Sequence, residues 1–192
     1  MIAALNKRLA GGARGLFACD RCVRCKFVRC EKAAAAVEMG LVAAPFLGLL
    51  VALFQTALVF FAGRVLDETT EQASRYIMTG QAQQANMTQA GFATYVCQNT
   101  FALFNCNNFM INVQNYSSFS SASTTTPTLS FNAQNQVNNQ WTYSPGNPGD
   151  IVVVQVMYQW PLVLGPLAFN LSNLANGNRL LVSTAVFKNE PY

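Results

Sequence analysis

The longest hydrophobic pattern in the chain is one uninterrupted apolar run near its N-terminus. Met39–Ala62 reads MGLVAAPFLGLLVALFQTALVFFA and contains no formal charge. As a helix rising about 1.5 Å per residue, this run spans roughly 36 Å, enough to cross a bilayer core of about 30 Å. A secretory signal peptide has an apolar region of only about 7–15 residues, followed by a small-residue cleavage site. The run therefore predicts a transmembrane anchor that stays in the protein.

The periodic pattern of a helix continues beyond this run. After Gly63, apolar and small residues recur at spacings of three and four through about Gln84. The members of this stripe are Val65, Leu66, Thr69, Ala73, Tyr76 and Ile77. The charged residues on the other face are Asp67, Glu68, Glu71 and Arg75. We therefore expect the anchor helix to continue out of the membrane, half-buried along one side.

Apolar segments in the second half of the chain predict a sheet. In Phe109–Tyr116, apolar and polar side chains alternate, which predicts a strand. Ile151–Trp160 is apolar on both faces over its first half, which favours a central strand, and Leu180–Phe187 predicts a third. Because two strands rarely form a stable sheet alone, we expect these three to pair. The prediction is an α+β domain in which a small antiparallel sheet lies on the long helix.

Two further segments connect these elements. A second helix is predicted from about Thr88 to Asn99. Residues 117–150 are rich in Ser, Thr, Asn, Gln, Gly and Pro. They predict a long polar excursion with a short strand at Thr128–Phe131. Because long loops in compact domains are often functional, this excursion is a candidate contact surface.

The positive charge of the chain is confined to its N-terminus. The net charge is +4, and residues 1–32 hold eight of the 12 basic side chains, with only two acidic ones. After Gly63 there are four basic and five acidic side chains. Since basic flanks of a membrane helix remain in the cytoplasm, the N-terminus is predicted inside and the domain outside. A nucleic-acid-binding protein would spread basic charge over its folded surface, so we expect no nucleic-acid partner.

A single carboxylate, Glu38, lies at the start of the apolar run, directly after Ala33–Val37. An unpaired charge at the centre of a bilayer costs about 3 kcal/mol or more. Either Glu38 lies at the headgroup level, or it has a cationic partner. Cleavage between Ala33 and Ala34 would create such a partner, the α-amine of Ala34, and the amine of a neighbouring subunit would serve equally well. In that case Glu38 couples charge neutralisation to assembly.

These residues resemble the processing site of type IV pilin-like proteins, which a prepilin peptidase cuts after a small residue, with Glu at the fifth mature position. More closely, the chain from residue 33 to residue 192 resembles the TadE family of tight-adherence (Tad, type IVc) pilus assembly proteins. The resemblance is carried by AAAAVEMGLVAAPFLGLL, FQTALVFFAGRVLDETTEQASRYIMTGQAQ, the Cys97 and Cys106 pair, VVVQVMYQWP and LANGNRLLVSTAVFKNEPY. Ala33 stands where such sites usually carry Gly, and Met39 follows the Glu where an aromatic residue is common.

The resemblance implies a pilin-like fold and the role of a minor pseudopilin or assembly component of a Tad pilus. It implies a cytoplasmic leader at 1–33 that is cleaved, a transmembrane helix at 34–63, and a periplasmic or extracellular domain at 64–192. The implied partners are the inner membrane, a prepilin peptidase, other Tad pilins and assembly-platform proteins, in a hetero-oligomer or fibre. Glu38 would then register neighbouring helices. The alternative is a signal-anchored periplasmic binding or scaffold protein that is never processed.

Four cysteines in the leader have the spacing C-x2-C-x2-C-x4-C. They are Cys19, Cys22, Cys25 and Cys30. Four thiolates are the right number for a zinc ion or an iron–sulfur cluster. However, Arg and Lys interleave them, no apolar core surrounds them, and the last gap misses the ferredoxin spacing of three. We expect incidental reduced thiols and no cofactor, the alternative being a metal-sensing membrane protein.

The other two cysteines, Cys97 and Cys106, are predicted to lie outside the cytoplasm, where disulfides persist. On one unbroken helix their Cα atoms would be about 13.5 Å apart. A disulfide needs less than about 7 Å, so the bond requires a turn within Thr100–Asn105. We expect the disulfide, and two unpaired thiols are the alternative.

The composition argues against an enzyme. The chain contains no histidine, the commonest general base and metal ligand. Between Glu71 and Glu190 the one acidic residue is Asp150, which follows Pro148-Gly149 in a predicted turn. The sequence has no Gly-rich phosphate loop, and its domain has no paired carboxylates. We expect a protein without catalytic activity.

Overall fold

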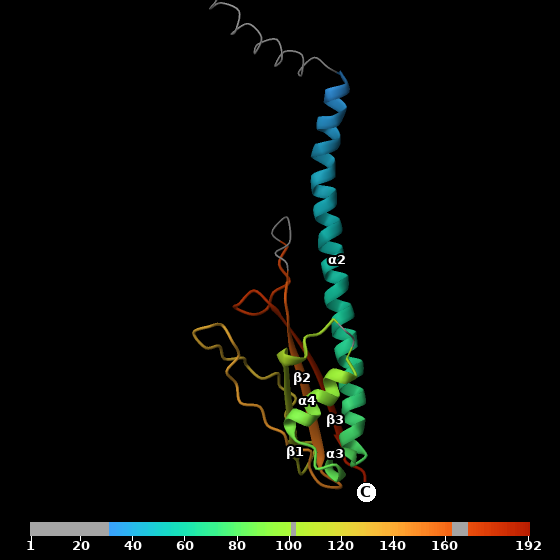
Figure 1. Cartoon of the computed structure of the whole chain (residues 1–192), viewed down its shortest axis with the longest axis vertical. Coiled ribbons are helices and arrows are strands. Elements are labelled where there is room, and N and C mark those ends of the chain that lie inside the picture. The colour runs from blue at the N-terminus through green and yellow to red at the C-terminus, as the bar shows by residue number, and fades with distance from the viewer. Residues whose placement is uncertain (1–30, 101–102, 163–168) are drawn as a thin grey trace, which may run out of the picture. The chain divides into compact units, whose positions relative to one another are not determined.

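A long helix, two short helices and a three-stranded sheet make up the described chain (Figure 1). The computed structural model describes residues 31–100, 103–162 and 169–192. In chain order the elements are α2 (Glu31–Met78), α3 (Gln81–Gln84), α4 (Gln89–Gln98), the 3-10 turn η1 (Cys106–Asn108), β1 (Phe109–Tyr116), β2 (Ile151–Trp160) and β3 (Arg179–Lys188). Residues Val51–Tyr192 form one compact unit. The predicted α+β class, with a long apolar N-terminal helix and a small antiparallel sheet, is confirmed.

The sheet has the strand order β1-β2-β3, and both pairs are antiparallel. The predicted central position of β2 is confirmed. In the register of the sheet, Val154 of β2 lies between Val113 of β1 and Ala185 of β3. The first eight residues of β2 are buried, which explains why this strand is apolar on both faces.

One side of the second half of α2 packs against the sheet. The buried residues of this stripe are Val59, Ala62, Leu66, Thr69, Thr70, Ala73, Ser74 and Ile77. The apolar members of this stripe share a hydrophobic core with alternate residues of β2, namely Val152, Val154 and Val156. Each fully buried Val, Leu or Ile contributes about 1.5–3 kcal/mol. The predicted half-buried continuation of the helix is therefore confirmed.

The long helix ends earlier than its periodicity predicts. α2 stops at Met78 and not near Gln84, because Gly80 adopts the left-handed conformation with φ +77°. A Cβ atom at this position would collide with the ring of Tyr192. Glycine is thus required both by the backbone conformation and by the close approach of the C-terminus. The short helix α3 follows this turn.

The C-terminal residues fasten the end of α2 to a neighbouring loop. The buried Asn189 side chain donates hydrogen bonds through Nδ2 to the carbonyl oxygens of Pro145 (2.8 Å) and Asn147 (3.1 Å). The N–H of Glu190 donates to the carbonyl oxygen of Met78 at 3.0 Å. Helix C-termini leave carbonyls without intrahelical partners, so this contact caps α2. The closing Asn189–Tyr192 stretch therefore has a structural role.

Replacing Asn189 by alanine is expected to lower the free energy of unfolding by about 1–3 kcal/mol, because two carbonyl oxygens lose their donor. Thermal unfolding of the full chain in detergent measures this loss. Asn138→Ala is the matched control, since the Asn138 side chain is exposed. Equal melting temperatures for the two variants would contradict the fastening role.

The predicted second helix is confirmed as α4, with its predicted first and last residues acting as caps. The Thr88 side chain accepts a hydrogen bond from the N–H of Gly91, and Asn99 is the C-cap. Phe92 is fully buried and lies 5.5 Å from the Tyr143 ring, centroid to centroid. Burial, and secondarily the electrostatic interaction with the neighbouring Tyr76, raises the pKa of Tyr143 to about 12.

The polar segment 117–150 returns to the free edge of β1. The N–H of Val113 donates to the carbonyl oxygen of Thr142 at 2.8 Å, and the N–H of Ser144 donates to that of Val113 at 2.9 Å. On the sheet, the buried Asn112 donates to Gln155 Oε1 at 3.1 Å. Gln155 in turn donates to the carbonyl oxygen of Thr125 at 3.1 Å. The segment is thus held against the sheet by hydrogen bonds that its backbone forms with β1 and with the Gln155 side chain.

The short strand predicted at Thr128–Phe131 is wrong. This part of the chain has only an isolated bridge between Phe131 and Val137. Asn132 Oδ1 accepts hydrogen bonds from the N–H groups of Gln134 (3.0 Å) and Gln136 (2.9 Å). Asparagine side chains that bind nearby backbone groups compete with strand pairing, which accounts for the difference.

The predicted disulfide between Cys97 and Cys106 is confirmed. It joins the end of α4 to η1, and the two Cα atoms are 5.4 Å apart. The chain therefore turns between the two cysteines, as the bond requires. The adjoining Phe104 ring is buried among the rings of Phe109, Tyr158 and Trp160.

Substituting Cys97 by serine is expected to destabilise the domain by up to about 3 kcal/mol, since the unfolded chain regains the entropy of a short open loop. Protease resistance of the full chain, with and without reductant, measures the effect. Reductant should sensitise the wild-type protein and leave Cys97→Ser unchanged. Equal resistance of the two proteins under oxidising conditions would refute a stabilising role of the bond.

Candidate assembly site

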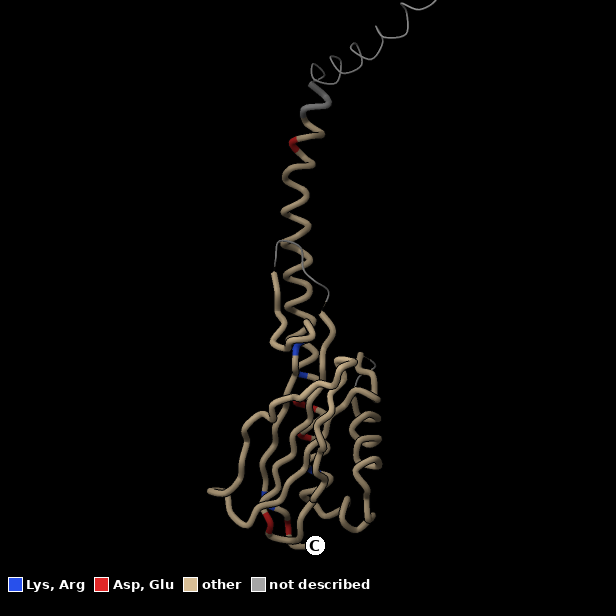
Figure 2. Tube along the Cα trace, turned by 90° about the vertical axis from the view of Figure 1, so that its left-hand side faces the viewer, with Lys and Arg blue, Asp and Glu red and all other residues tan. Residues whose placement is uncertain are grey.

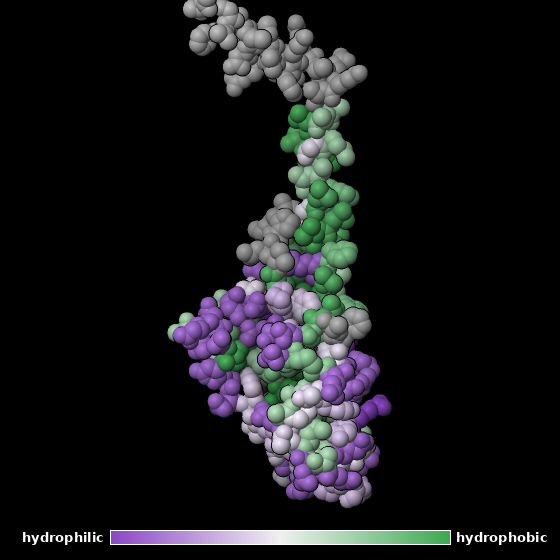
Figure 3. All heavy atoms as spheres, in the orientation of Figure 1, coloured by the Kyte–Doolittle hydropathy of each residue, from purple (hydrophilic) through white to green (hydrophobic). Residues whose placement is uncertain are grey.

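The N-terminal part of α2 carries apolar side chains on all sides. The exposed ones, with exposed fractions of 42–72%, are Val37, Met39, Leu41, Val42, Phe46, Leu47, Leu49, Leu50, Val51, Leu53, Phe54, Leu58, Phe60 and Phe61 (Figure 3). Leaving each of these side chains in water forgoes about 1.5–3 kcal/mol of favourable burial free energy. The segment Ala35–Met78 is long and apolar enough to cross a membrane. α2 therefore fits a single-pass membrane anchor.

Glu38 is the one charged residue of α2 between Ala35 and Gly63 (Figure 2). It lies on the helix, and its side chain is exposed. Within the described ranges, the recorded ion pair joins Arg64 Nη1 and Asp67 Oδ2 at 3.8 Å, and Glu38 takes no part in it. Among the described residues, Glu38 thus has no ion-pair partner in the uncleaved single chain.

The peptide bond between Ala33 and Ala34 lies in the first turn of α2, which begins at Glu31. A helical backbone places position 34 one turn before Glu38, about 6 Å away along the axis and on the same face. The amine that cleavage would create could thus reach the carboxylate of its own chain.

A face of small residues on α2 was missed by the sequence-based prediction. Gly40, Ala44 and Gly48 recur at intervals of four and share one face of the helix. Small residues at this spacing let membrane helices approach each other closely. The spacing of four residues could have revealed this face in the sequence. It was overlooked because the surrounding residues are uniformly apolar.

Asp150 has the structural role that its sequence context predicts. Its Oδ2 atom accepts hydrogen bonds from the N–H of Asn147 at 2.9 Å and from Asn115 Nδ2 at 3.3 Å. These bonds close the turn that precedes β2. The Asp150 carboxylate thus stabilises the conformation of this turn.

Metal ligands do not gather in the part of the chain that the structure describes. Within residues 31–100, 103–162 and 169–192, no three His, Cys, Asp or Glu side chains are placed to hold a metal ion. The four leader cysteines Cys19, Cys22, Cys25 and Cys30 lie outside these residues, as does most of the predicted leader at 1–33.

A comparison with known protein families finds a match, and it lies on the apolar helix α2. Residues 33–75 match the model of the family described as TadE-like protein. No curated protein and no solved structure matches the chain. The matched segment contains Ala33, Ala34 and Glu38, and it continues along α2 into the stripe packed on the sheet. The chain is therefore TadE-like over residues 33–75, which confirms the resemblance for this segment and supports a protein associated with a Tad pilus.

Proposed function

We propose that this chain is a minor pseudopilin or assembly component of a Tad (type IVc) pilus. The observation that carries the proposal is the TadE-like match, which begins at residue 33 and includes the Glu38 carboxylate. A structural role also agrees with the position of Asp150, whose carboxylate is engaged in a turn.

Insertion follows from the distribution of charge. The eight basic residues of 1–32 keep the N-terminus in the cytoplasm, and residues 34–63 cross the inner membrane. The domain at 64–192 is then exported to the periplasm or the extracellular pilus. The disulfide between Cys97 and Cys106 supports this orientation, because such bonds persist in oxidising compartments.

Processing by a prepilin peptidase between Ala33 and Ala34 would give Glu38 its partner. The new α-amine and the carboxylate attract strongly in lipid, where water does not screen them. An amine from the next subunit neutralises Glu38 equally well, so that correct stacking of helices is favoured over a free subunit. The exposed small residues Gly40 and Ala44 would allow the close helix approach that such stacking needs.

The exported domain would supply the contacts with other pilins and with assembly-platform proteins. Segment 117–150 is polar, largely exposed, and anchored to β1 through Val113. A surface of this kind can vary in sequence without disturbing the core of the domain. It is therefore the part that we expect to determine partner choice.

The alternative is a signal-anchored periplasmic binding or scaffold protein whose leader is never removed. Ala33, in the place of the usual Gly, is the residue that favours this alternative. The intact mass of the protein extracted from membranes separates the two functions. A mature form that begins at Ala34 is expected, and a chain that retains residues 1–33 in cells with active prepilin peptidase would reject processing.

A further inference from the structure

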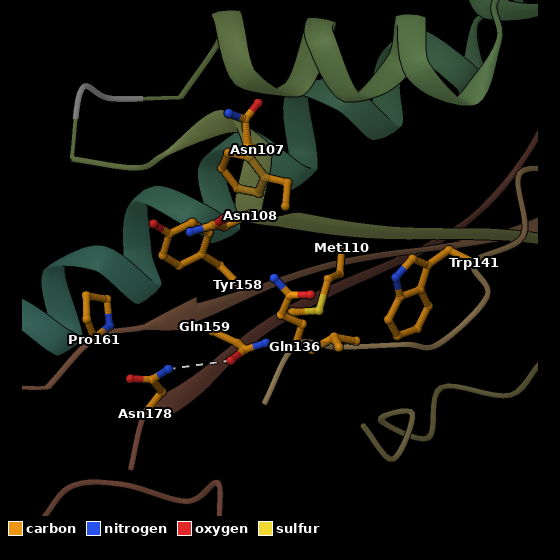
Figure 4. A pocket seen from close by; sticks show the side chains of 11 residues that line it. Asn107, Asn108, Met110, Gln136, Trp141, Tyr158, Gln159, Pro161 and Asn178 are labelled. Carbon is orange, nitrogen blue, oxygen red and sulfur yellow. Dashed lines mark hydrogen bonds between the residues drawn. The ribbon is translucent and has the colours of Figure 1, made fainter. Parts of the chain in front are cut away.

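A cleft of about 530 Å³ opens where the end of β2 meets η1 and the polar segment 117–150 (Figure 4). Its volume lies within the range of about 300–1,000 Å³ that is typical of small-molecule sites. The side chains around it come from separate parts of the chain and surround one open space (Figure 4). The cleft has no part in the membrane helix or in the predicted processing site.

Amide side chains dominate the polar lining of the cleft. They are Asn107, Asn108, Gln136, Gln159 and Asn178. Each amide offers two N–H donors and one acceptor oxygen. None of the described residues that line the cleft is charged. Arg179, which follows Asn178, directs its guanidinium away to the carbonyl oxygen of Leu171 at 2.9 Å. The lining therefore suits a neutral ligand with many groups that both donate and accept hydrogen bonds.

Two of these amides are held in place by neighbours. Gln159 Oε1 accepts hydrogen bonds from Asn176 Nδ2 at 2.8 Å and from Asn178 Nδ2 at 3.5 Å (Figure 4). Gln136 Oε1 accepts one from Asn132 Nδ2 at 3.3 Å. Both glutamines thus present their NH₂ donors for other partners. Groups fixed before binding lose little entropy when a ligand arrives.

Aromatic and apolar side chains complete the cleft. Trp141 is half-buried at one end of it, and Met110 and Tyr158 lie in its wall. The carbonyl oxygen of Trp141 accepts a hydrogen bond from Gln89 Nε2 at 3.3 Å, which fixes the backbone beneath the ring. An indole supplies a large, rigid apolar surface with a polar edge. Sugars match this combination, because they have apolar C–H faces and a rim of hydroxyl groups.

We propose that this cleft binds a neutral carbohydrate. Hydroxyl groups of the sugar bind the five amides, and a C–H face of the ring stacks on Trp141. Sulfated and carboxylated sugars are disfavoured, because none of the described lining residues is a cation that could neutralise them once water is displaced. The binding goes beyond the proposed role in pilus assembly and does not depend on it.

The first test is a printed array of neutral oligosaccharides with sulfated and sialylated counterparts, probed with the full chain in detergent. At least one neutral oligosaccharide should bind, and charged counterparts should bind at least tenfold more weakly. Absence of binding to every neutral member, or a preference for charged members, would overturn the proposal.

The second test locates the site by fluorescence. The chain has two tryptophans, so Trp160→Phe leaves Trp141 as the single reporter. Titration of this variant with the best neutral sugar should shift its emission. Asn108→Ala and Trp141→Ala should weaken array binding at least tenfold, Trp141→Phe should retain most of it, and Gln72→Ala on the exposed side of α2 should change nothing. Array binding that survives both Asn108→Ala and Trp141→Ala would place the sugar elsewhere and refute the site.

Discussion

Substitution of Glu38 by glutamine is expected to reduce surface fibres at least tenfold while leaving membrane insertion intact. Removing one partner of a buried ion pair costs about 3–5 kcal/mol, because the other charge stays buried without compensation. Each 1.4 kcal/mol is about a tenfold change in an equilibrium constant, so subunit stacking should weaken strongly. Electron microscopy counts the fibres, and membrane fractionation measures insertion.

The matched control is Glu71→Gln, which removes a carboxylate from the exposed side of α2 outside the apolar run. This variant should assemble normally, because its charge is solvated. A normal number of fibres in Glu38→Gln would reject the registry role of the carboxylate and leave Glu38 as a residue at the headgroup level.

Phe92→Ala should be the most destabilising single truncation within the domain, at about 3–5 kcal/mol. Phe92 is the largest fully buried side chain of the described residues and shares the core with α2 and the sheet. Its removal leaves a cavity beside the Tyr143 ring. Thermal unfolding of the full chain in detergent measures the loss.

Phe119→Ala serves as the control, because Phe119 is 61% exposed in the polar segment. Its truncation should change stability by no more than about 0.5 kcal/mol. Comparable losses in the two variants would contradict the position of the core between α4, α2 and the sheet.

The hydrophobic pattern was sufficient to predict the long helix and the central strand of this protein. Two patterns predicted α2: the apolar run, and the stripe of Leu66, Thr69, Ala73 and Ile77. In a helix packed on a core, residues at spacings of three and four lie on the buried face. The continuous apolar character of Ile151–Trp160 predicted a central strand, because a strand buried on both faces needs no alternation. Both hydrophobic patterns lie within a single element, so they can be read from the sequence without knowledge of the fold.

Positions determined by distant contacts could not be predicted in this way. The helix pattern continues past Met78, but Gly80 turns the chain so that Tyr192, far away in sequence, can pack against it. Similarly, Thr128–Phe131 has strand-like composition, yet neighbouring asparagines satisfy its backbone. Tertiary contact overrode local propensity in both places.

The residues of the candidate site were proposed from the sequence alone, and their backbone conformation was not predicted. A charge at the edge of an apolar run drew attention to Glu38, and small residues drew attention to Ala33 and Ala34. The helical conformation at the predicted cleavage point was not evident, because alanines favour helix while a protease substrate needs an extended chain. The amide-lined cleft was also missed, since its residues come from five separate segments and have no common spacing.

The central claim, that this chain takes part in building a Tad pilus, is tested most directly by counting fibres on cells from which the chain has been deleted. The account predicts that surface fibres disappear and return when the wild-type chain is restored. An unchanged number of fibres on the deletion cells would contradict it.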